Sequence, residues 1–243
     1  IHRIRQFLPE CAIRILTREN LKDGFSLLDG IDVIADPSWK RGTAYNWKQS
    51  LQSLGIDPKR FDLVIAKPSP TDWCRWQRKT FTPRLKWNRE YDRLVDAFDL
   101  PPEFTYIGVQ VEAETGYGLW RNWPQERWQE LFDLLEKKGN VRVLLFGYGA
   151  QQSFSHPMII DLRGKTSLFQ LLSIIKNRCT AMILPDSGIL SMTYYLDVSF
   201  PIRLVTLWGD PNHGILKQGV NSPNSQLIHI PLIGERRDLL SVS

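Results

Sequence analysis

The sequence is poor in the residues that build metal centres and disulfide frameworks. Its 243 residues include only three cysteines and four histidines. The cysteines, Cys11, Cys74 and Cys179, lie far apart and no C-x-x-C spacing occurs. This distribution argues against a disulfide framework and against a zinc site. No paired-aspartate metal motif is present either. We therefore expect no metal, no cofactor and a reducing, cytoplasmic compartment.

Long apolar runs and strong charge imbalance are also missing. No apolar run approaches the roughly 18 residues of a membrane span, and Ile1–Arg5 leads into no apolar segment typical of a signal peptide. The net charge is +5, and most of it lies in residues 1–103. With 42% hydrophobic residues, the chain can bury one large core or two small ones. The front part is the better candidate for meeting an acidic partner.

Short apolar segments alternate with segments of helical periodicity along the whole chain. We predict strands at 12–16, 31–35, 61–66, 106–111, 142–146, 158–161, 181–184, 203–207 and 226–230. We predict helices at 47–54, 91–98, 124–135 and 167–177. The sequence LPPEF at 100–104 breaks the pattern. The fold class is therefore α/β, with parallel sheets flanked by helices in two units, 1–100 and 101–243.

The predicted strand ends of the second unit carry the candidate chemistry, because ligands of such sheets bind beyond the carboxyl ends of the strands. Glycine occurs in four of these loops, at 112–124, 147–152, 185–188 and 208–214. In one of them, Asp186, Ser187 and Gly188 stand directly before a predicted helix, where free N–H groups favour an anion.

Simpler interpretations exist for each of these features. The Asp-Ser-Gly corner is also what an ordinary helix N-cap looks like. GYGAQQ lacks the third glycine of GxGxxG, so the dinucleotide signal is weak and an oxidoreductase is disfavoured. We expect Trp123 and Trp128 to lie in the core, and His213 to be a solvated side chain.

In combination, these segments resemble the heptosyltransferase family, the glycosyltransferase family 9 of bacterial lipopolysaccharide synthesis. The resemblance covers about residues 104–215 and rests on RNWPQERWQEL, a strand followed by GYG, IIDLRGKTSL, PDSG and TLWGDP, in that order. It implies the GT-B architecture of two Rossmann-like domains, an incomplete acceptor-side domain at 1–100 and a nucleotide-sugar-binding domain at 101–243. The front half matches the family more loosely.

The implied activity is an inverting, metal-independent transfer of a heptose-like sugar from a nucleoside-diphosphate sugar to a lipopolysaccharide or other glycan acceptor. The implied donor-binding residues are Thr115, Arg121, Gly147, Gln151, Lys165, Asp186, Ser187, Gly188 and Ser191. Arg121 stands where the family has lysine, and Ser191 stands where it has histidine. The family's catalytic base lies on a Gly-Asp loop that we expect before Ile1. Two hypotheses follow: an active transferase, or a nucleotide-sugar-binding domain without turnover.

Residues 72–87 are unlike the rest of the front part. They hold five basic residues, one acid and three tryptophans. Three interpretations are open: a basic surface loop whose tryptophans pack on the sheet, a site for an anionic glycolipid acceptor or membrane surface, and a site for single-stranded nucleic acid. The second would use Arg75, Arg78 and Lys79 and would place the protein peripherally on the inner face of the inner membrane. Nucleic acid is the least favoured.

Overall fold

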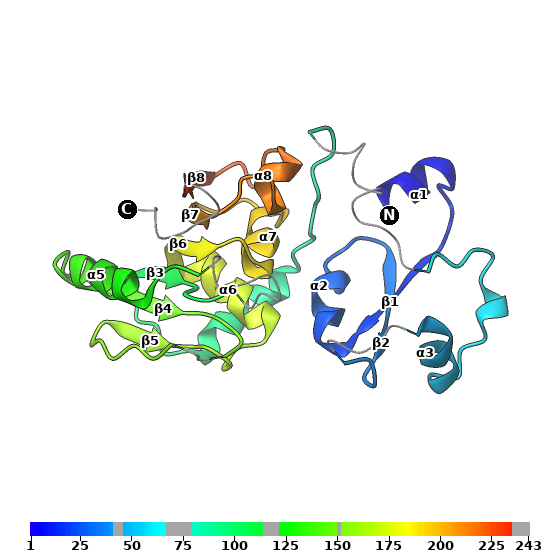
Figure 1. Cartoon of the computed structure of the whole chain (residues 1–243), viewed down its shortest axis with the longest axis horizontal. Helices are drawn as coiled ribbons and strands as arrows, with labels where there is room; N and C mark the ends of the chain where they lie inside the picture. The colour runs from blue at the N-terminus through cyan, green and yellow to red at the C-terminus, as the bar shows by residue number, and fades with distance from the viewer. Residues whose placement is uncertain (41–45, 67–78, 114–121, 150–151, 235–243) are drawn as a thin grey trace. The chain divides into compact units, whose positions relative to one another are not determined.

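The computed structural model describes residues 1–40, 46–66, 79–113, 122–149 and 152–234. The chain divides into two compact units, Ile1–Gln77 and Arg78–Ser243. Figure 1 shows the elements of both.

The first unit contains a small parallel sheet. Its strands β1 (Ile13–Arg18) and β2 (Ile31–Asp36) pair in register from Ile13 with Ile31 to Arg18 with Asp36. Its helices are α1 (His2–Phe7), η1 (Glu19–Leu21), α2 (Lys22–Ser26), α3 (Trp47–Ser53) and η2 (Pro58–Arg60). Both strands and the helix at 47–54 confirm their predictions.

The predicted strand at 61–66 is wrong. These residues are irregular and pair with no strand among the described residues. Apolar composition alone does not make a strand, because a strand also needs a neighbour for its backbone groups. The side chain of Leu63 accordingly remains 64% exposed.

The second unit is built on a six-stranded parallel sheet in the order β5-β4-β3-β6-β7-β8. The strands are β3 (Thr105–Val109), β4 (Val141–Leu145), β5 (Ile159–Asp161), β6 (Cys179–Pro185), β7 (Ile202–Trp208) and β8 (Leu227–Ile233). All six confirm their predictions. Counted from β3, this is the Rossmann order 3-2-1-4-5-6, and the order reverses between β3 and β6.

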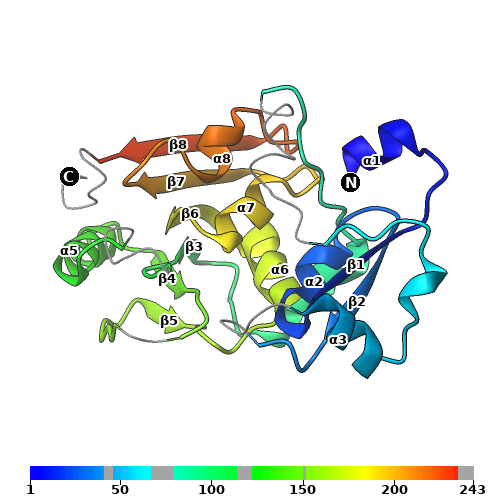
Figure 2. The same ribbon diagram turned by 45° about the vertical axis from the view of Figure 1, so that its right-hand side comes forward.

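Helices cover both faces of this sheet. They are α5 (Gln125–Glu136), α6 (Leu168–Arg178), α7 (Gly188–Tyr194) and α8 (Gly214–Gln218). Figures 1 and 2 show α5 on one face and α6 and α7 on the other. The α/β class with helix-flanked parallel strands is therefore what the alternation predicted.

Two tryptophans anchor the core between α5 and the sheet. Trp128 is fully buried with Phe132 against Val109, Val143 and neighbouring strand residues, and Trp123 packs edge-on against Trp128 at 4.9 Å between ring centroids. Both were expected in the core: Trp128 is buried there, and Trp123 is partly buried against it. The cap of α6 is also as predicted, because Ser167 and Gln170 form a reciprocal capping box.

The helix predicted at 91–98 is a 3₁₀ helix, η4 (Arg89–Ala97). Its backbone bonds to α6 where an α-helix would bond to itself. The Val95 N–H donates to Ser173 Oγ at 3.2 Å, and the Asp92 carbonyl accepts from the same hydroxyl at 3.1 Å. The ring of Tyr91 stacks on Phe169 at 4.4 Å.

This packing joins η4 to the second unit. The division between the units therefore falls before residue 79, whereas the sequence suggested a linker near residue 101. The break at LPPEF separates η4 from β3, but α6 holds both sides of that break together.

Candidate functional site

The corner between β6 and α7 lies at the point where the strand order reverses. Strand β6 ends at Pro185 and α7 begins at Gly188. The Ser187 hydroxyl accepts from the Leu190 N–H at 3.2 Å, so Ser187 is an N-cap. The same hydroxyl donates to Gln110 Oε1 at 2.7 Å. The cap is therefore also a bridge from β6 to β3.

Gln110 fixes the other side of this corner. It is buried directly after β3, and its N–H donates to the Ile183 carbonyl at 3.0 Å. Its Nε2 donates to the Glu112 carbonyl at 2.9 Å. A buried amide with several partners is held in one orientation. Gln110 thus ties the end of β3 to the end of β6.

The loop after β7 packs against the same corner. Gly214 has φ +45°, and a Cβ there would collide with Asp186 Oδ1 and lie 3.1 Å from Trp208 Cη2. The backbone at Gly214 therefore approaches Asp186 more closely than any side chain would allow. Glycine at this position lets the ends of β6 and β7 meet.

The same loop holds an aspartate–histidine pair. The Asp210 side chain is 4% exposed, and its Oδ2 lies 3.3 Å from His213 Nε2. Its Oδ1 accepts from the Asn212 N–H at 2.9 Å. His213 was expected to be only solvated. Its side chain is 57% exposed, but it also faces this buried carboxylate.

A second network fixes the loops after β4 and β5. The guanidinium of Arg163, 5% exposed, binds both oxygens of Asp161, and its Nη1 donates to the Gln152 carbonyl at 2.6 Å. The hydrogen bonds from Arg163 hold the pKa of Asp161 below its usual value, and the same pair raises the pKa of Arg163. Glu112 Oε1 accepts from the Gln152 N–H at 2.6 Å. The loop after β4 is therefore tied to β3 and to β5.

A model of glycosyltransferase family 9 (heptosyltransferase) matches residues 84–229, which is more than half of the chain and covers β3 to β7 and the start of β8. The chain belongs to glycosyltransferase family 9. A comparison with curated proteins by sequence found no match.

Solved structures of the same family share the fold of the family 9 chain. ADP-heptose LPS heptosyltransferase II of E. coli has a TM-score of 0.62 at 16% identity, over 100% of this chain and 88% of that one. A family 9 glycosyltransferase of Veillonella parvula has 0.61 at 16%, over 95% and 79%. E. coli heptosyltransferase WaaC with ADP has 0.53 at 15%, over 99% and 89%.

The predicted donor-binding residues fall into three groups in the family 9 chain. Asp186, Ser187 and Gly188 form the corner, and Ser191 follows in α7 with its N–H bonded to the Ser187 carbonyl at 3.1 Å. Gly147 and Lys165 follow β4 and β5. The residues outside the described part of the chain are Thr115, Arg121 and Gln151.

Gly147 and Lys165 take part mainly in local structure. Gly147 has φ +152°, and its carbonyl accepts from the Gly164 N–H at 2.9 Å. Lys165 Nζ donates to the Asp161 carbonyl at 2.8 Å. The ammonium of Lys165 is therefore directed at the end of β5.

Sequence reasoning missed Gln110, Arg163 and Asp210. A faint signal existed for each. Gln110 is the one polar residue in the apolar run YIGVQV, Arg163 follows Asp161 by two positions, and Asp210 precedes His213 by three. The spacing alone does not reveal burial, and burial is what makes these residues distinctive.

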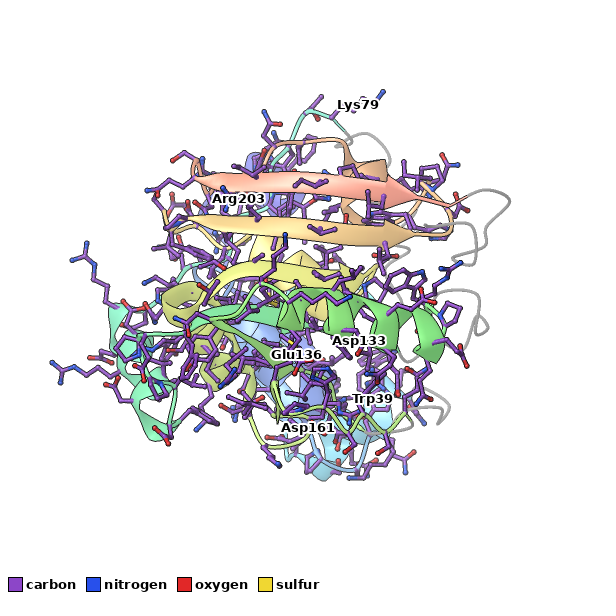
Figure 3. The ribbon with its side chains drawn as sticks, turned by 90° about the vertical axis from the view of Figure 1, so that its left-hand side faces the viewer. Trp39, Lys79, Asp133, Glu136, Asp161 and Arg203 are labelled. Carbon is purple, nitrogen blue, oxygen red and sulfur yellow. The ribbon has the colours of Figure 1, made fainter. Side chains whose placement is uncertain are left out.

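The basic stretch at 72–87 is described only from Lys79 onward, so Arg75 and Arg78 lie outside the described residues. Lys79 is exposed and projects away from the ribbon in Figure 3. Its N–H donates to the Gln218 carbonyl at 2.9 Å. Trp87 Nε1 donates to Asp92 Oδ1 at 2.9 Å. The described part of the stretch therefore contacts η4 and the end of α8, and Trp73 and Trp76 lie outside the described residues.

The described residues contain neither a cluster of metal ligands nor a helix long enough to span a membrane. Among them, no three His, Cys, Asp or Glu side chains are grouped so that they could hold a metal ion. In the same residues, no helix has the length and apolar character needed to cross a membrane.

Proposed function

We propose that the chain transfers a heptose-like sugar from a nucleoside-diphosphate sugar to a lipopolysaccharide or other glycan acceptor. The observation that carries this proposal is the family 9 match, which extends across the switch point of the six-stranded sheet. Family membership also favours turnover over a binding domain without activity. The E. coli relatives are named for ADP-heptose and ADP, so ADP is the first nucleotide to test.

The donor diphosphate would lie beyond the carboxyl ends of β3 and β6, where ligands of such sheets bind. In this proposal the N–H groups at Ser187 and Gly188 donate to it. Helix α7 has only seven residues, so its dipole adds little. Arg121 supplies the compensating cation in this proposal, through a charge-assisted bond. Thr115, Gly147, Gln151, Lys165 and Ser191 complete the proposed contacts.

The proposed reaction inverts the anomeric centre without a metal. The acceptor oxygen attacks the anomeric carbon from the face opposite the diphosphate. The bond from that carbon to the phosphate oxygen breaks, its electron pair leaves with the nucleoside diphosphate, and the acceptor proton passes to a base. Groups preorganised around the leaving diphosphate stabilise the negative charge that develops there.

In the same proposal, the two units are the two domains of a GT-B transferase, with the acceptor bound on the N-terminal side. Arg75, at the end of the first unit, and Arg78 and Lys79, at the start of the second, would attract an anionic glycolipid or membrane surface, where each cation contributes about 1 kcal/mol. Changing all three to serine should then reduce flotation with anionic liposomes at low salt, and unchanged flotation would remove these residues from acceptor binding. Competition by an oligonucleotide would instead indicate a nucleic-acid site.

Calorimetry with ADP and UDP tests the donor site. Arg121→Ala should weaken binding by on the order of 1.5–3 kcal/mol, the range for hydrogen bonds to charged groups. Unchanged affinity would remove Arg121 from the site.

EDTA should leave the affinity for the nucleoside diphosphate intact, and a loss restored by Mg²⁺ would contradict the metal-independent mechanism. The anomeric configuration of the product, read by NMR, tests inversion.

A further inference from the structure

A diphosphate beyond the carboxyl ends of β3 and β6 would lie near acidic side chains. Asp186 stands at the corner and Glu112 follows β3, whereas the carboxylate of Asp161 is already paired with Arg163. In the described parts of the strand-end loops, the cationic side chains are Arg163, Lys165 and His213. Arg163 is buried in its pair with Asp161, and Lys165 binds the Asp161 carbonyl. Of these described side chains, His213 is the one left to supplement Arg121, the cation that the proposed donor site already includes.

His213 stands on the loop that touches the corner. It directly precedes Gly214, whose backbone packs against Asp186. Helices α7 and α8, which begin at Gly188 and Gly214, are also in contact. The imidazole therefore belongs to the segment that borders the proposed diphosphate position.

A buried carboxylate orients this imidazole. Asp210 is 4% exposed and lies 3.3 Å from His213 Nε2, while two bonds from Asn212 hold its other oxygen. Burying a carboxylate is costly unless hydrogen bonds compensate for the lost water. His213 occupies the N-cap position of α8, but its side chain makes no capping bond. The ring is thus held by Asp210 and left open to a ligand on its exposed side.

We propose that His213 contacts the β-phosphate of the donor and that Asp210 is its positioning residue. This inference rests on the proposed function. With Nε2 directed at Asp210, the second ring nitrogen, Nδ1, is the atom that would donate to a phosphate oxygen. An imidazole from the loop after β7 would then add a hydrogen-bond donor to the hydroxyl that Ser191 offers from α7.

The sugar transfer needs no reactant besides the donor and the acceptor. The acceptor oxygen forms its bond to the anomeric carbon as the bond to the β-phosphate oxygen breaks, and the electron pair leaves with the diphosphate. The hydrogen bond from His213 strengthens as that negative charge grows. The proton of the acceptor hydroxyl passes to solvent water or to a base on the acceptor side.

The test compares ADP with AMP by calorimetry on the full chain. If UDP is the diphosphate that binds, UDP and UMP replace them. His213→Ala should lower diphosphate affinity about 10-fold, at the low end of the range for bonds to charged groups, and should change monophosphate affinity less than 2-fold. Asp210→Asn should lower diphosphate affinity less than His213→Ala does. In the Asp210→Asn background, His213→Ala should lower diphosphate affinity by a smaller factor than it does in the wild type.

A matched control is His156→Gln. His156 Nε2 also lies near two carboxylates, 3.4 Å from Asp133 and 3.6 Å from Glu136 on α5 (Figure 3). Its side chain is only 6% exposed, so its loss should lower the melting temperature and leave diphosphate affinity unchanged. His213→Ala should instead lower diphosphate affinity and leave the melting temperature unchanged. In addition, Ser191→His placed in the His213→Ala background should restore part of the lost affinity.

The binding measurements distinguish failure of the His213 inference from failure of the proposed function. If the wild type binds a diphosphate and His213→Ala, still folded by circular dichroism, binds it equally well, the inference is overturned and the proposed function stands. An equal loss for monophosphate and diphosphate would overturn the assignment to the β-phosphate. If the wild type binds neither ADP nor UDP, the proposed function fails and the inference fails with it.

Discussion

Gly214 shows how one missing side chain brings two strand ends together. Its positive φ and its contact with Asp186 both oppose a Cβ. Gly214→Ala should therefore lower the free energy of unfolding by about 2–4 kcal/mol, which combines left-handed strain with overpacking. Because Asp186 must move, ADP affinity should fall as well. Urea denaturation and calorimetry measure the two effects.

Gly139 is the matched control for this prediction. It lies in the same unit with φ +83°, but nothing stands within 4 Å of its added Cβ. Gly139→Ala should therefore show strain alone, about 1–2 kcal/mol, and normal ADP affinity. Equal costs for the two substitutions would contradict the close packing of Gly214 on Asp186.

His229 couples the stability of the second unit to pH. Its Nε2 lies 2.8 Å from Thr206 Oγ1, which accepts from Trp208 Nε1 at 2.6 Å, and its ring meets the ring of Tyr194 edge-on. Burial lowers the pKa of His229 from the usual 6.5. A base with a lowered folded-state pKa contributes stability that is present above pH 6.5 and is lost as pH falls toward the folded value.

His229→Gln should remove this dependence. The wild type should lose stability in urea titrations between about pH 7 and pH 5, because the unfolded chain binds the proton more readily than the folded one. The variant should lose less over the same interval. Parallel curves for the two proteins would show that His229 is not responsible.

At the scale of elements, Arg163 and Asp161 hold the loop after β4 in place. Removing one member of a partly buried pair leaves the other charge without compensation. Because Asp161 is 41% exposed, we expect Asp161→Asn to cost only about 1–3 kcal/mol near pH 7. The lowered pKa of Asp161 makes its contribution fully present above its usual 3.8 and lost as pH falls through the folded value.

Stability measured against pH checks the Asp161 prediction. The difference between wild type and Asp161→Asn should be constant from about pH 5 to pH 8 and should shrink below about pH 4. A difference that grows in acid would be incompatible with a carboxylate stabilised by Arg163.

The strands and helices of the second unit were predictable because their apolar residues recur with the right period and every strand finds a neighbour. Residues 61–66 have the same composition as a buried strand, but no partner strand among the described residues. Residues 91–98 have helical periodicity, but Ser173 and Asn177 of α6 bond to their backbone and favour a tighter helix. Tertiary contacts of this kind leave no trace in a local pattern.

At the scale of the whole molecule, the packing of η4 on α6 makes a prediction about truncation. Asp92 and Lys176 form an ion pair at 2.8 Å, and Tyr91 covers Phe169. A fragment of residues 79–243 should therefore fold cooperatively, whereas 101–243 should melt at a lower temperature because α6 loses this cover. Calorimetric melting of both fragments decides between the boundaries. Equal melting temperatures would favour the boundary predicted near residue 101.

The candidate site was only partly predictable from sequence. Asp186, Ser187 and Gly188 stand out because an acid, a hydroxyl and a glycine end an apolar strand. Gln110 and Asp210 do not, because their importance arises from burial and from contacts between strands far apart in the sequence. The strand order that brings the β3 and β6 ends together is likewise a property of the assembled sheet.

We propose above all that the diphosphate of a sugar donor binds beyond the ends of β3 and β6. Backbone amide NMR during titration with ADP or UDP locates this binding. We expect the largest shifts at Gln110, at Asp186–Ser191 and in the loop at 209–214, with small changes on β1 and β2. Binding with shifts elsewhere and none at Gln110 or Ser187 would contradict it.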